Sequence, residues 1–286
     1  MTINCRGKLI DITQPKIMGI LNITPDSFYS ESRHHSGNEL VEAVGKMLDD
    51  GAAIIDIGGY STRPGAKDVS AEEELSRVIP AIELLVENFP EVVISIDTFR
   101  SDVARQAVAG GAAIVNDVSA GLLDDKMLAT VATLRVPYIM MHMRGTPQTM
   151  TQFTDYEDLA AEILLYFSER INVARSHGIS DIIIDPGFGF SKTTQQNFGL
   201  LEKLDVLKIC GLPILVGMSR KSMVYKPLGL EADAALTGTT VVNTLALTRG
   251  ASILRVHDVK EAVQCVKLFG MSNGFTGDDR VHSSGS

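Results

Sequence analysis

Eight short apolar runs recur along the chain, and most of them end on or beside a polar residue. They are rich in isoleucine and valine and alternate little with polar residues, which is typical of strands covered on both faces. The runs occupy residues 16–22, 52–59, 92–97, 112–117, 137–142, 181–187, 213–221 and 252–258. The pattern predicts eight buried strands.

Helical patterns lie between many of these runs, at 39–51, 71–89, 101–111, 155–178 and 262–269. Gly51 suits a helix C-cap, and Ser101 is a candidate N-cap. Eight strands that alternate with helices predict an α/β protein built as a (β/α)₈ barrel. A doubly wound open sheet is the alternative. The count of eight and the absence of a linker favour the barrel, as a single domain.

The two ends of the chain differ from this pattern. Residues 3–13 alternate like a short β-hairpin, which we expect to cap the bottom of the barrel. Residues 272–286 are polar and rich in glycine and serine, which predicts a disordered tail. The predicted domain therefore spans residues 1–271.

Composition excludes several classes of protein. The 286-residue chain is 45% hydrophobic and 21% charged, as in ordinary globular proteins, and its net charge of −9 argues against broad nucleic-acid binding. No apolar run reaches the roughly 18 residues of a membrane span. The N-terminus lacks a signal peptide, and the three widely spaced cysteines show no metal-binding pattern. We therefore expect a cytoplasmic protein with reduced thiols and no membrane partner.

The polar strand ends point to a binding site. In such a barrel the carboxyl ends of the strands converge on one face, where active sites are built. The residues predicted to face this polar bowl are Asn22, Asp56, Asp97, Asn116, Asp185, Lys221, Arg255 and His257. Each alone could cap a helix or loop. Four at different strand ends, Asp97, Asn116, Asp185 and Lys221, instead suit a flat heterocycle rich in N–H donors.

A second group has the chemistry of an oxyanion site. Arg255 and His257 alternate along one strand end and leave it on the same side, with Arg63, Thr62 and Asn22 expected nearby. Arginine favours planar, bidentate contacts with phosphate, and barrel phosphate sites lie near the last strands. This group predicts a phosphate or diphosphate site. The alternative is a surface ion pair with Asp258.

The loop "DPGFGFSKT" follows the sixth apolar run. Its glycines let backbone N–H groups approach a ligand, and Phe188 and Phe190 are candidates to stack on a ring.

Several stretches together resemble dihydropteroate synthases, a folate-pathway family. They are "GILNITPDSF", "DIGGYSTRPGA", "SIDTFR", "IVNDVSAG", "MMHMRGTP", "DPGFGFSKT", "GMSRKSM" and "RVHDV". The resemblance implies a (β/α)₈ barrel that joins 4-aminobenzoate to 6-hydroxymethyl-7,8-dihydropterin diphosphate with Mg²⁺. The products are 7,8-dihydropteroate and pyrophosphate, formed through a dissociative pterin-cation mechanism. It also implies a homodimer with small-molecule substrates.

The resemblance also implies roles for single residues. Asp97, Asn116, Asp185 and Lys221 would hold the pterin, and Thr62, Arg63, Arg255 and His257 the diphosphate. Asn22 would help to bind Mg²⁺. Phe28, Pro64, Phe190 and Ser219 would border the aminobenzoate site, where sulfonamides bind in this family. Asp97, Lys221, Arg255 and His257 are the expected catalytic residues.

Two departures and two alternatives remain. The segment from Tyr29 to Gly37 lacks the family's usual paired glycines, and Tyr60 stands where glutamate is usual. A non-catalytic or methyl-transferring folate-binding barrel would share the pterin pocket but need no diphosphate site. An aldolase-like barrel would need a Schiff-base lysine, for which Lys221 is the candidate.

Overall fold

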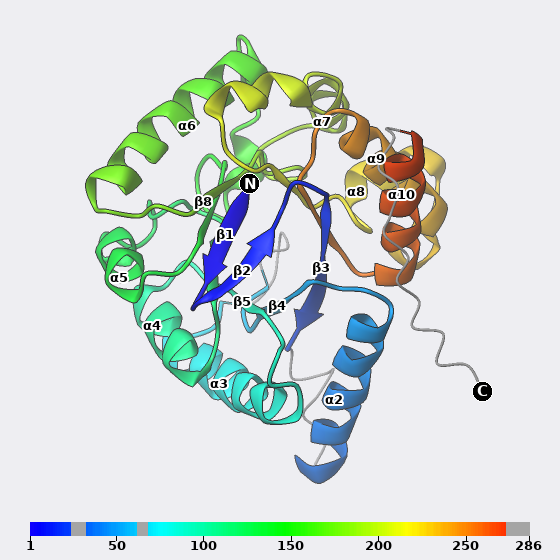
Figure 1. Ribbon diagram of the computed structural model, residues 1–286. Helices are drawn as coiled ribbons and strands as arrows, with labels where there is room; N and C mark the ends of the chain where they lie inside the picture. Colours follow the sequence, from blue (N-terminus) through cyan, green and yellow to red (C-terminus); the bar gives the residue numbers. More distant parts are fainter. Residues whose placement is uncertain (24–32, 62–67, 273–286) are drawn as a thin grey trace, which may run out of the picture.

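The computed structural model describes residues 1–23, 33–61 and 68–272. Within these residues, eight parallel strands form one sheet that curves into a barrel ringed by helices (Figure 1). All eight lie within the apolar runs, so the strand predictions are confirmed. They are β3 (Lys16–Asn22), β4 (Ile54–Gly58), β5 (Ile94–Asp97), β6 (Ile114–Asp117), β7 (Tyr138–Met141), β8 (Ile182–Asp185), β9 (Leu215–Val216) and β10 (Ile253–Val256).

The sheet closes on itself. Its strands are hydrogen-bonded in the order β8-β7-β6-β5-β4-β3-β10-β9. An isolated parallel bridge between Ile184 and Ile214 joins the two edge strands, and the Ile184 N–H donates to the Pro213 carbonyl at 3.0 Å. This closure confirms the barrel and excludes the doubly wound open sheet.

The α-helices surround the outside of the barrel (Figure 1). They are α2 (Arg33–Asp49), α3 (Ala71–Asn88), α4 (Ser101–Gly110), α5 (Met127–Leu134), α6 (Leu159–Ser176), α7 (Thr194–Glu202), α8 (Ser222–Tyr225), α9 (Leu236–Thr248) and α10 (Val259–Ser272). Short 3₁₀ turns are η1 (Met150–Gln152), η2 (Leu204–Cys210), η3 (Lys226–Leu228) and η4 (Ala232–Ala234).

Side-chain caps explain where several helices begin. The Asp158 carboxylate accepts the backbone N–H groups of Ala160 and Ala161 at the start of α6. The predicted N-cap Ser101 is wrong: Arg100 is the cap residue of α4, and the Ser101 N–H instead donates to the Asp124 carboxylate at 2.7 Å. A carboxylate from a distant loop thus satisfies the first backbone N–H of α4.

Sequence periodicity did not predict α5, α7, α8 or α9. α9 is rich in threonine and valine, whose branched side chains lower helix propensity. Val242, Ala246 and Leu247 are nevertheless buried against the barrel, and this packing outweighs the propensity.

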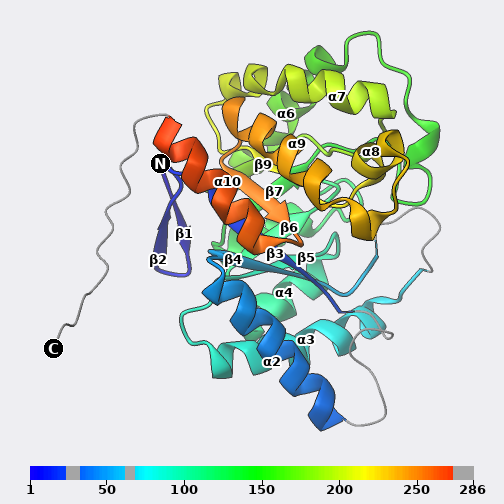
Figure 2. The same ribbon diagram turned by 90° about the vertical axis from the view of Figure 1, so that its right-hand side faces the viewer.

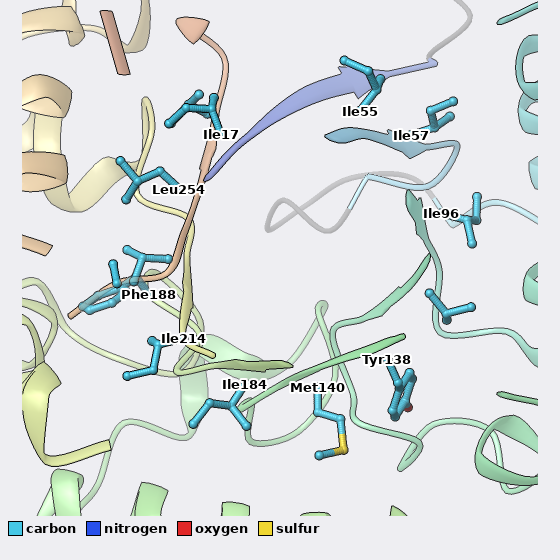
Figure 3. Packing of buried hydrophobic residues seen from close by; sticks show 14 of the residues in the cluster. Ile17, Ile55, Ile57, Ile96, Tyr138, Met140, Ile184, Phe188, Ile214 and Leu254 are labelled. Carbon is cyan, nitrogen blue, oxygen red and sulfur yellow. The ribbon is translucent and has the colours of Figure 1, made fainter. Parts of the chain in front are cut away.

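Side chains of each strand alternate between two apolar layers. One layer faces the helices and includes Ile55, Ile57 and Ile96 (Figure 3). The other fills the amino-terminal end of the barrel interior with one residue from nearly every strand: Met18, Ile54, Ile114, Ile139, Ile183, Leu215 and Ile253. Covering on both faces is why the strands read as continuous apolar runs.

The N-terminal hairpin closes the bottom of the barrel, as predicted. β1 (Thr2–Cys5) pairs with β2 (Lys8–Asp11), and its Ile3 and Ile10 join the inner apolar layer. The hairpin lies at the end opposite to that toward which the strand arrows point (Figure 2). The hairpin therefore covers the amino-terminal end of the inner apolar layer, opposite the carboxyl ends of the strands.

The chain ends leave two predictions open. α10 continues through Ser272, one residue past the predicted domain end, and the rest of the expected tail, 273–286, lies outside the described residues. No helix in the described ranges is long and apolar enough to cross a membrane. The cytoplasmic location stays a prediction.

Candidate active site

Above the inner apolar layer, the barrel interior becomes polar. Strand alternation places Asp56 two residues after Ile54, Asn116 after Ile114, Asp185 after Ile183 and Arg255 after Ile253, all on the inner side. These four strands therefore change from apolar to polar as they near their carboxyl ends. The structure gathers these polar side chains at the carboxyl-terminal end of the barrel interior, and their binding roles stay predictions.

Arg255 joins two of the carboxylates in this bowl. Its Nε donates to Asp56 Oδ2 at 2.5 Å, and its Nη2 donates to Asp97 Oδ2 at 2.7 Å. Asn116 Nδ2 also donates to Asp56 Oδ2, at 3.1 Å. The alternative pairing of Arg255 with Asp258 is wrong, since Asp258 instead accepts from Arg220 at 2.6 Å. Arg255 therefore belongs to the cluster of carboxylates around Asp56 and Asp97. The sequence instead placed it with the predicted oxyanion site.

The charges in this group do not balance. One guanidinium faces two carboxylates, of which Asp56 is fully buried and Asp97 is 13% exposed. Burial raises the pKa of Asp97 to about 7, and the attraction of Arg255 opposes this increase. Asp56 Oδ1 has no hydrogen-bond partner in the described part of the chain. The bowl thus carries excess negative charge and favours a ligand that is cationic or rich in N–H donors.

Lys221 lies beside Asp185 on the other side of the bowl. Its Nζ donates to the Phe188 carbonyl at 2.6 Å and lies 4.7 Å from the centre of the Phe190 ring. Burial lowers the pKa of Lys221 to about 8, while the negative charge of Asp185 opposes this decrease. Burial likewise raises the pKa of Asp185, and Lys221 opposes the increase. The two groups keep each other charged in a poorly solvated position.

His257 and Ser219 are neighbours at the end of β10. The His257 backbone N–H donates to Ser219 Oγ at 3.1 Å, and a second hydrogen bond of 3.0 Å joins Ser219 Oγ to His257 Nδ1. The Ser219 side chain, 3% exposed, therefore orients the imidazole. This contact brings a residue predicted for the diphosphate next to one predicted for the aminobenzoate.

Other predicted residues have different outcomes. Phe188 cannot stack on a ligand, because it is fully buried in the core between sheet and helices (Figure 3). Phe190 packs with Met141 and Val118 beneath Lys221. Four predicted site residues lie outside the described residues: Phe28, Thr62, Arg63 and Pro64.

Tyr60, the unusual residue after β4, joins three loops. Its ring packs edge-on against Phe99 at 5.2 Å, and its hydroxyl donates to Asp68 at 3.2 Å and accepts from Gln148. The substitution thus acts on packing between the loops at the barrel mouth.

The described residues do not form a ready-made metal cage: within 1–23, 33–61 and 68–272, no three His, Cys, Asp or Glu side chains gather as one would require. Asn22, at the end of β3, lies near Gly58, with its amide oxygen 3.8 Å from the position that a Cβ on this glycine would occupy. A single amide oxygen fits Mg²⁺ that keeps its waters and is held mainly by substrate phosphates.

Comparison with known proteins decides the family. A family model described as pterin binding enzyme matches residues 18–257. The dihydropteroate synthase of Escherichia coli K12 is 42% identical over 270 residues, which cover 94% of this chain and 95% of the relative. The chain belongs to the dihydropteroate synthase family of pterin-binding enzymes.

Solved structures of the family share the fold. A Yersinia pestis dihydropteroate synthase with a sulfonamide drug complex superposes with a TM-score of 0.90 at 38% identity, covering 96% of this chain and 100% of that one. The Xanthomonas albilineans enzyme with 4-aminobenzoic acid gives 0.88 at 40% identity, covering 95% and 98%. The same enzyme with 7,8-dihydropteroate gives 0.85 at 38%, covering 96% and 99%.

Sequence reasoning missed part of the site. It gave Asp56 no specific role, although Asp56 is the second partner of Arg255. It also passed over His142 and Lys192, two buried polar residues that contact each other. Lys192 stands in the quoted loop "DPGFGFSKT", but a lysine near a surface loop is normally solvated. Only its tertiary contacts distinguish it.

Proposed function

We propose that this protein condenses 6-hydroxymethyl-7,8-dihydropterin diphosphate with 4-aminobenzoate to give 7,8-dihydropteroate and pyrophosphate. The observation that carries the proposal is the convergence of Asp97, Asn116, Asp185 and Lys221 around one bowl in a chain of this family. Asp97, Asn116 and Asp185 offer carboxylate and amide acceptors for the N–H donors of a pterin, and Lys221 offers N–H donors for its acceptors. The structures with 4-aminobenzoic acid and 7,8-dihydropteroate support the same chemistry.

The proposed reaction breaks the C–O bond at the pterin methylene, and the electron pair leaves with the diphosphate. Positive charge then develops on the methylene and spreads into the ring. Asp97 lies in a buried position where a carboxylate stabilises such charge strongly, since little water competes. The aminobenzoate nitrogen forms the new C–N bond, and its proton passes to solvent or to pyrophosphate.

The leaving group is expected to lie toward the end of β10. The His257 imidazole, oriented by Ser219, is suited to contact the diphosphate oxygens. Arg255 lies between this region and the carboxylates Asp56 and Asp97. Its positive charge is suited to stabilise these carboxylates and also the negative charge that develops on the leaving diphosphate. When bound, Mg²⁺ would further neutralise the diphosphate, with Asn22 as a protein ligand.

A direct assay tests the function. We expect pyrophosphate release when the protein is mixed with the pterin diphosphate, Mg²⁺ and 4-aminobenzoate, together with dihydropteroate detected by mass spectrometry. Omitting aminobenzoate should stop product formation. A non-catalytic folate-binding barrel would bind pterin without releasing pyrophosphate, and that result would exclude the synthase.

We also propose that the protein is a homodimer, as the family resemblance implies. α9 exposes Leu236, Val241 and Leu245, of which the last two lie one turn apart on the same face. Exposed apolar groups of this kind mark interaction surfaces. Light scattering should give twice the chain mass, and Val241→Glu should give the single mass. Leu9→Glu, at a leucine of the hairpin that is more exposed than Val241, should stay dimeric. A monomeric wild-type protein would contradict this proposal.

A further inference from the structure

Lys192 is a buried lysine with no role in the chemistry above. It is 8% exposed and directly follows the loop 187–191. A buried ammonium is costly unless its three N–H groups each meet an acceptor. Lys192 Nζ lies 3.1 Å from His142 Nδ1, 3.0 Å from the Gly187 carbonyl oxygen and 3.0 Å from the Phe190 carbonyl oxygen. All three acceptors are neutral, and burial lowers the pKa of Lys192 to about 7, while the negative charge of Asp185 opposes this decrease. The three contacts join a strand end to a loop.

His142 is built as a fixed acceptor for this ammonium. It is 2% exposed, and burial lowers the pKa of its imidazole to about 2, so the ring is neutral and Nδ1 accepts from Lys192. The Tyr166 ring packs edge-on against it at 4.8 Å. Its backbone N–H donates to the Asp185 carbonyl at 2.9 Å. His142 is therefore anchored to the strand that carries Asp185.

The loop that Lys192 holds is the one that contacts Lys221. The Gly187 carbonyl accepts from both Lys192 and the Phe190 N–H, which closes a tight turn. Between these residues, the Phe188 carbonyl accepts from Lys221 Nζ, and the Phe190 ring lies beneath it. Gly187 has a φ of +71°, and a Cβ there would overlap the His142 carbonyl oxygen. This conformation packs the loop directly against His142.

We propose that Lys192 is a positioning residue for Lys221: it ties the Gly187–Phe190 loop to His142, so that the Phe188 carbonyl and the Phe190 ring hold the Lys221 ammonium beside Asp185. The proposal deepens the proposed function and rests on it, since Lys221 is expected to hold the pterin. In this proposal Lys192 does not contact the substrate itself. It fixes the position of Lys221, which is expected to contact the pterin.

The first test needs no substrate. In Lys192→Met, which keeps the length and burial of the side chain, Lys221 should react faster with acetic anhydride, by about fivefold or more, because its ammonium is released from the Phe188 carbonyl. Mass spectrometry of tryptic peptides measures the rate, with the exposed Lys46 as an internal reference. An unchanged Lys221 rate in folded Lys192→Met would overturn the proposal, whether or not the protein proves to be a synthase.

The second test is a double-mutant cycle on pterin affinity, measured by calorimetry with 6-hydroxymethylpterin. Lys192→Met should weaken binding about tenfold in the wild-type background and less than about threefold in the Lys221→Met background. Lys192 also favours the charged form of Asp185. An effect that persists in full without Lys221 would mean that Lys192 acts through Asp185 or general stability, and would contradict the proposal.

A milder pair of variants covers the case in which Lys192→Met fails to fold. His142→Gln keeps an acceptor for Lys192, whereas His142→Phe keeps a ring and removes the acceptor. We expect His142→Phe to raise the Lys221 acetylation rate and His142→Gln to stay closer to wild type. Equal rates in the two folded variants would overturn the proposal. If the wild-type protein released no pyrophosphate in the assay above, that result would contradict the proposed function and leave the role of Lys192 untouched.

Discussion

Asp97→Asn is expected to lower kcat by about 10²- to 10³-fold, the size of effect seen when one preorganised electrostatic group is removed from an active site. The carboxylate lies at the carboxyl end of β5, with its Oδ2 2.7 Å from Arg255 Nη2. Asparagine keeps the shape and an acceptor oxygen for Arg255 but removes the charge that would face the developing cation. Rapid-quench or steady-state pyrophosphate release measures the change.

Stability should change much less than turnover. The variant retains an acceptor for Arg255, so the free energy of unfolding should shift by no more than about 1 kcal/mol in urea denaturation. Asp102→Asn is the matched control, because Asp102 is an exposed carboxylate paired with Arg105 on the same helix. A variant that keeps turnover within tenfold of wild type would show that the Asp97 charge is not needed.

The same variant predicts a change in pH dependence. Burial raises the pKa of Asp97 from 3.8 to about 7, so the carboxylate forms as the pH rises through 7, and kcat/KM should rise over that range. The raised pKa also means that this group's contribution to stability falls as the pH rises from about 4 to 7. With the pKa of Lys221 near 8, activity should fall again above that pH. In Asp97→Asn the rise near pH 7 should disappear while the fall remains.

Arg255→Ala is expected to abolish measurable turnover and to lower the free energy of unfolding by roughly 3–5 kcal/mol. The large stability effect follows because removal of one guanidinium leaves Asp56 and Asp97 as neighbouring, poorly solvated carboxylates without a cation. The sequence placed Arg255 in the diphosphate site, and that role alone predicts that its loss spares pterin binding. The ion pairs show that pterin affinity should fall as well.

A compensated variant separates the two effects. Arg255→Met combined with Asp56→Asn removes one charge of each sign, so it should recover much of the lost stability but no turnover. Arg105→Ala, at an exposed arginine, is the control for loss of an arginine as such. The idea that Arg255 compensates the carboxylates would fail if the double variant were as unstable as Arg255→Ala, as measured by thermal or urea unfolding.

The sequence by itself determined the barrel and the composition of its mouth. A strand buried on both faces must be apolar along its length and can carry polar groups only where it leaves the core. Eight runs with polar ends therefore specify both the strand count and the face on which the site lies. Local capping was less certain, as Ser101 shows, because a carboxylate from a distant loop can accept a backbone N–H at the start of a helix.

Tertiary structure alone decided which polar groups form ion pairs and hydrogen bonds with one another. Arg255 bonds to Asp56, 199 residues away along the chain, and Lys192 to His142, 50 residues away. No local pattern encodes such pairs, because the parallel strands bring them together only when the barrel closes. The sequence thus specified which groups line the bowl. The folded arrangement specified which of them are paired and which are left to meet a ligand.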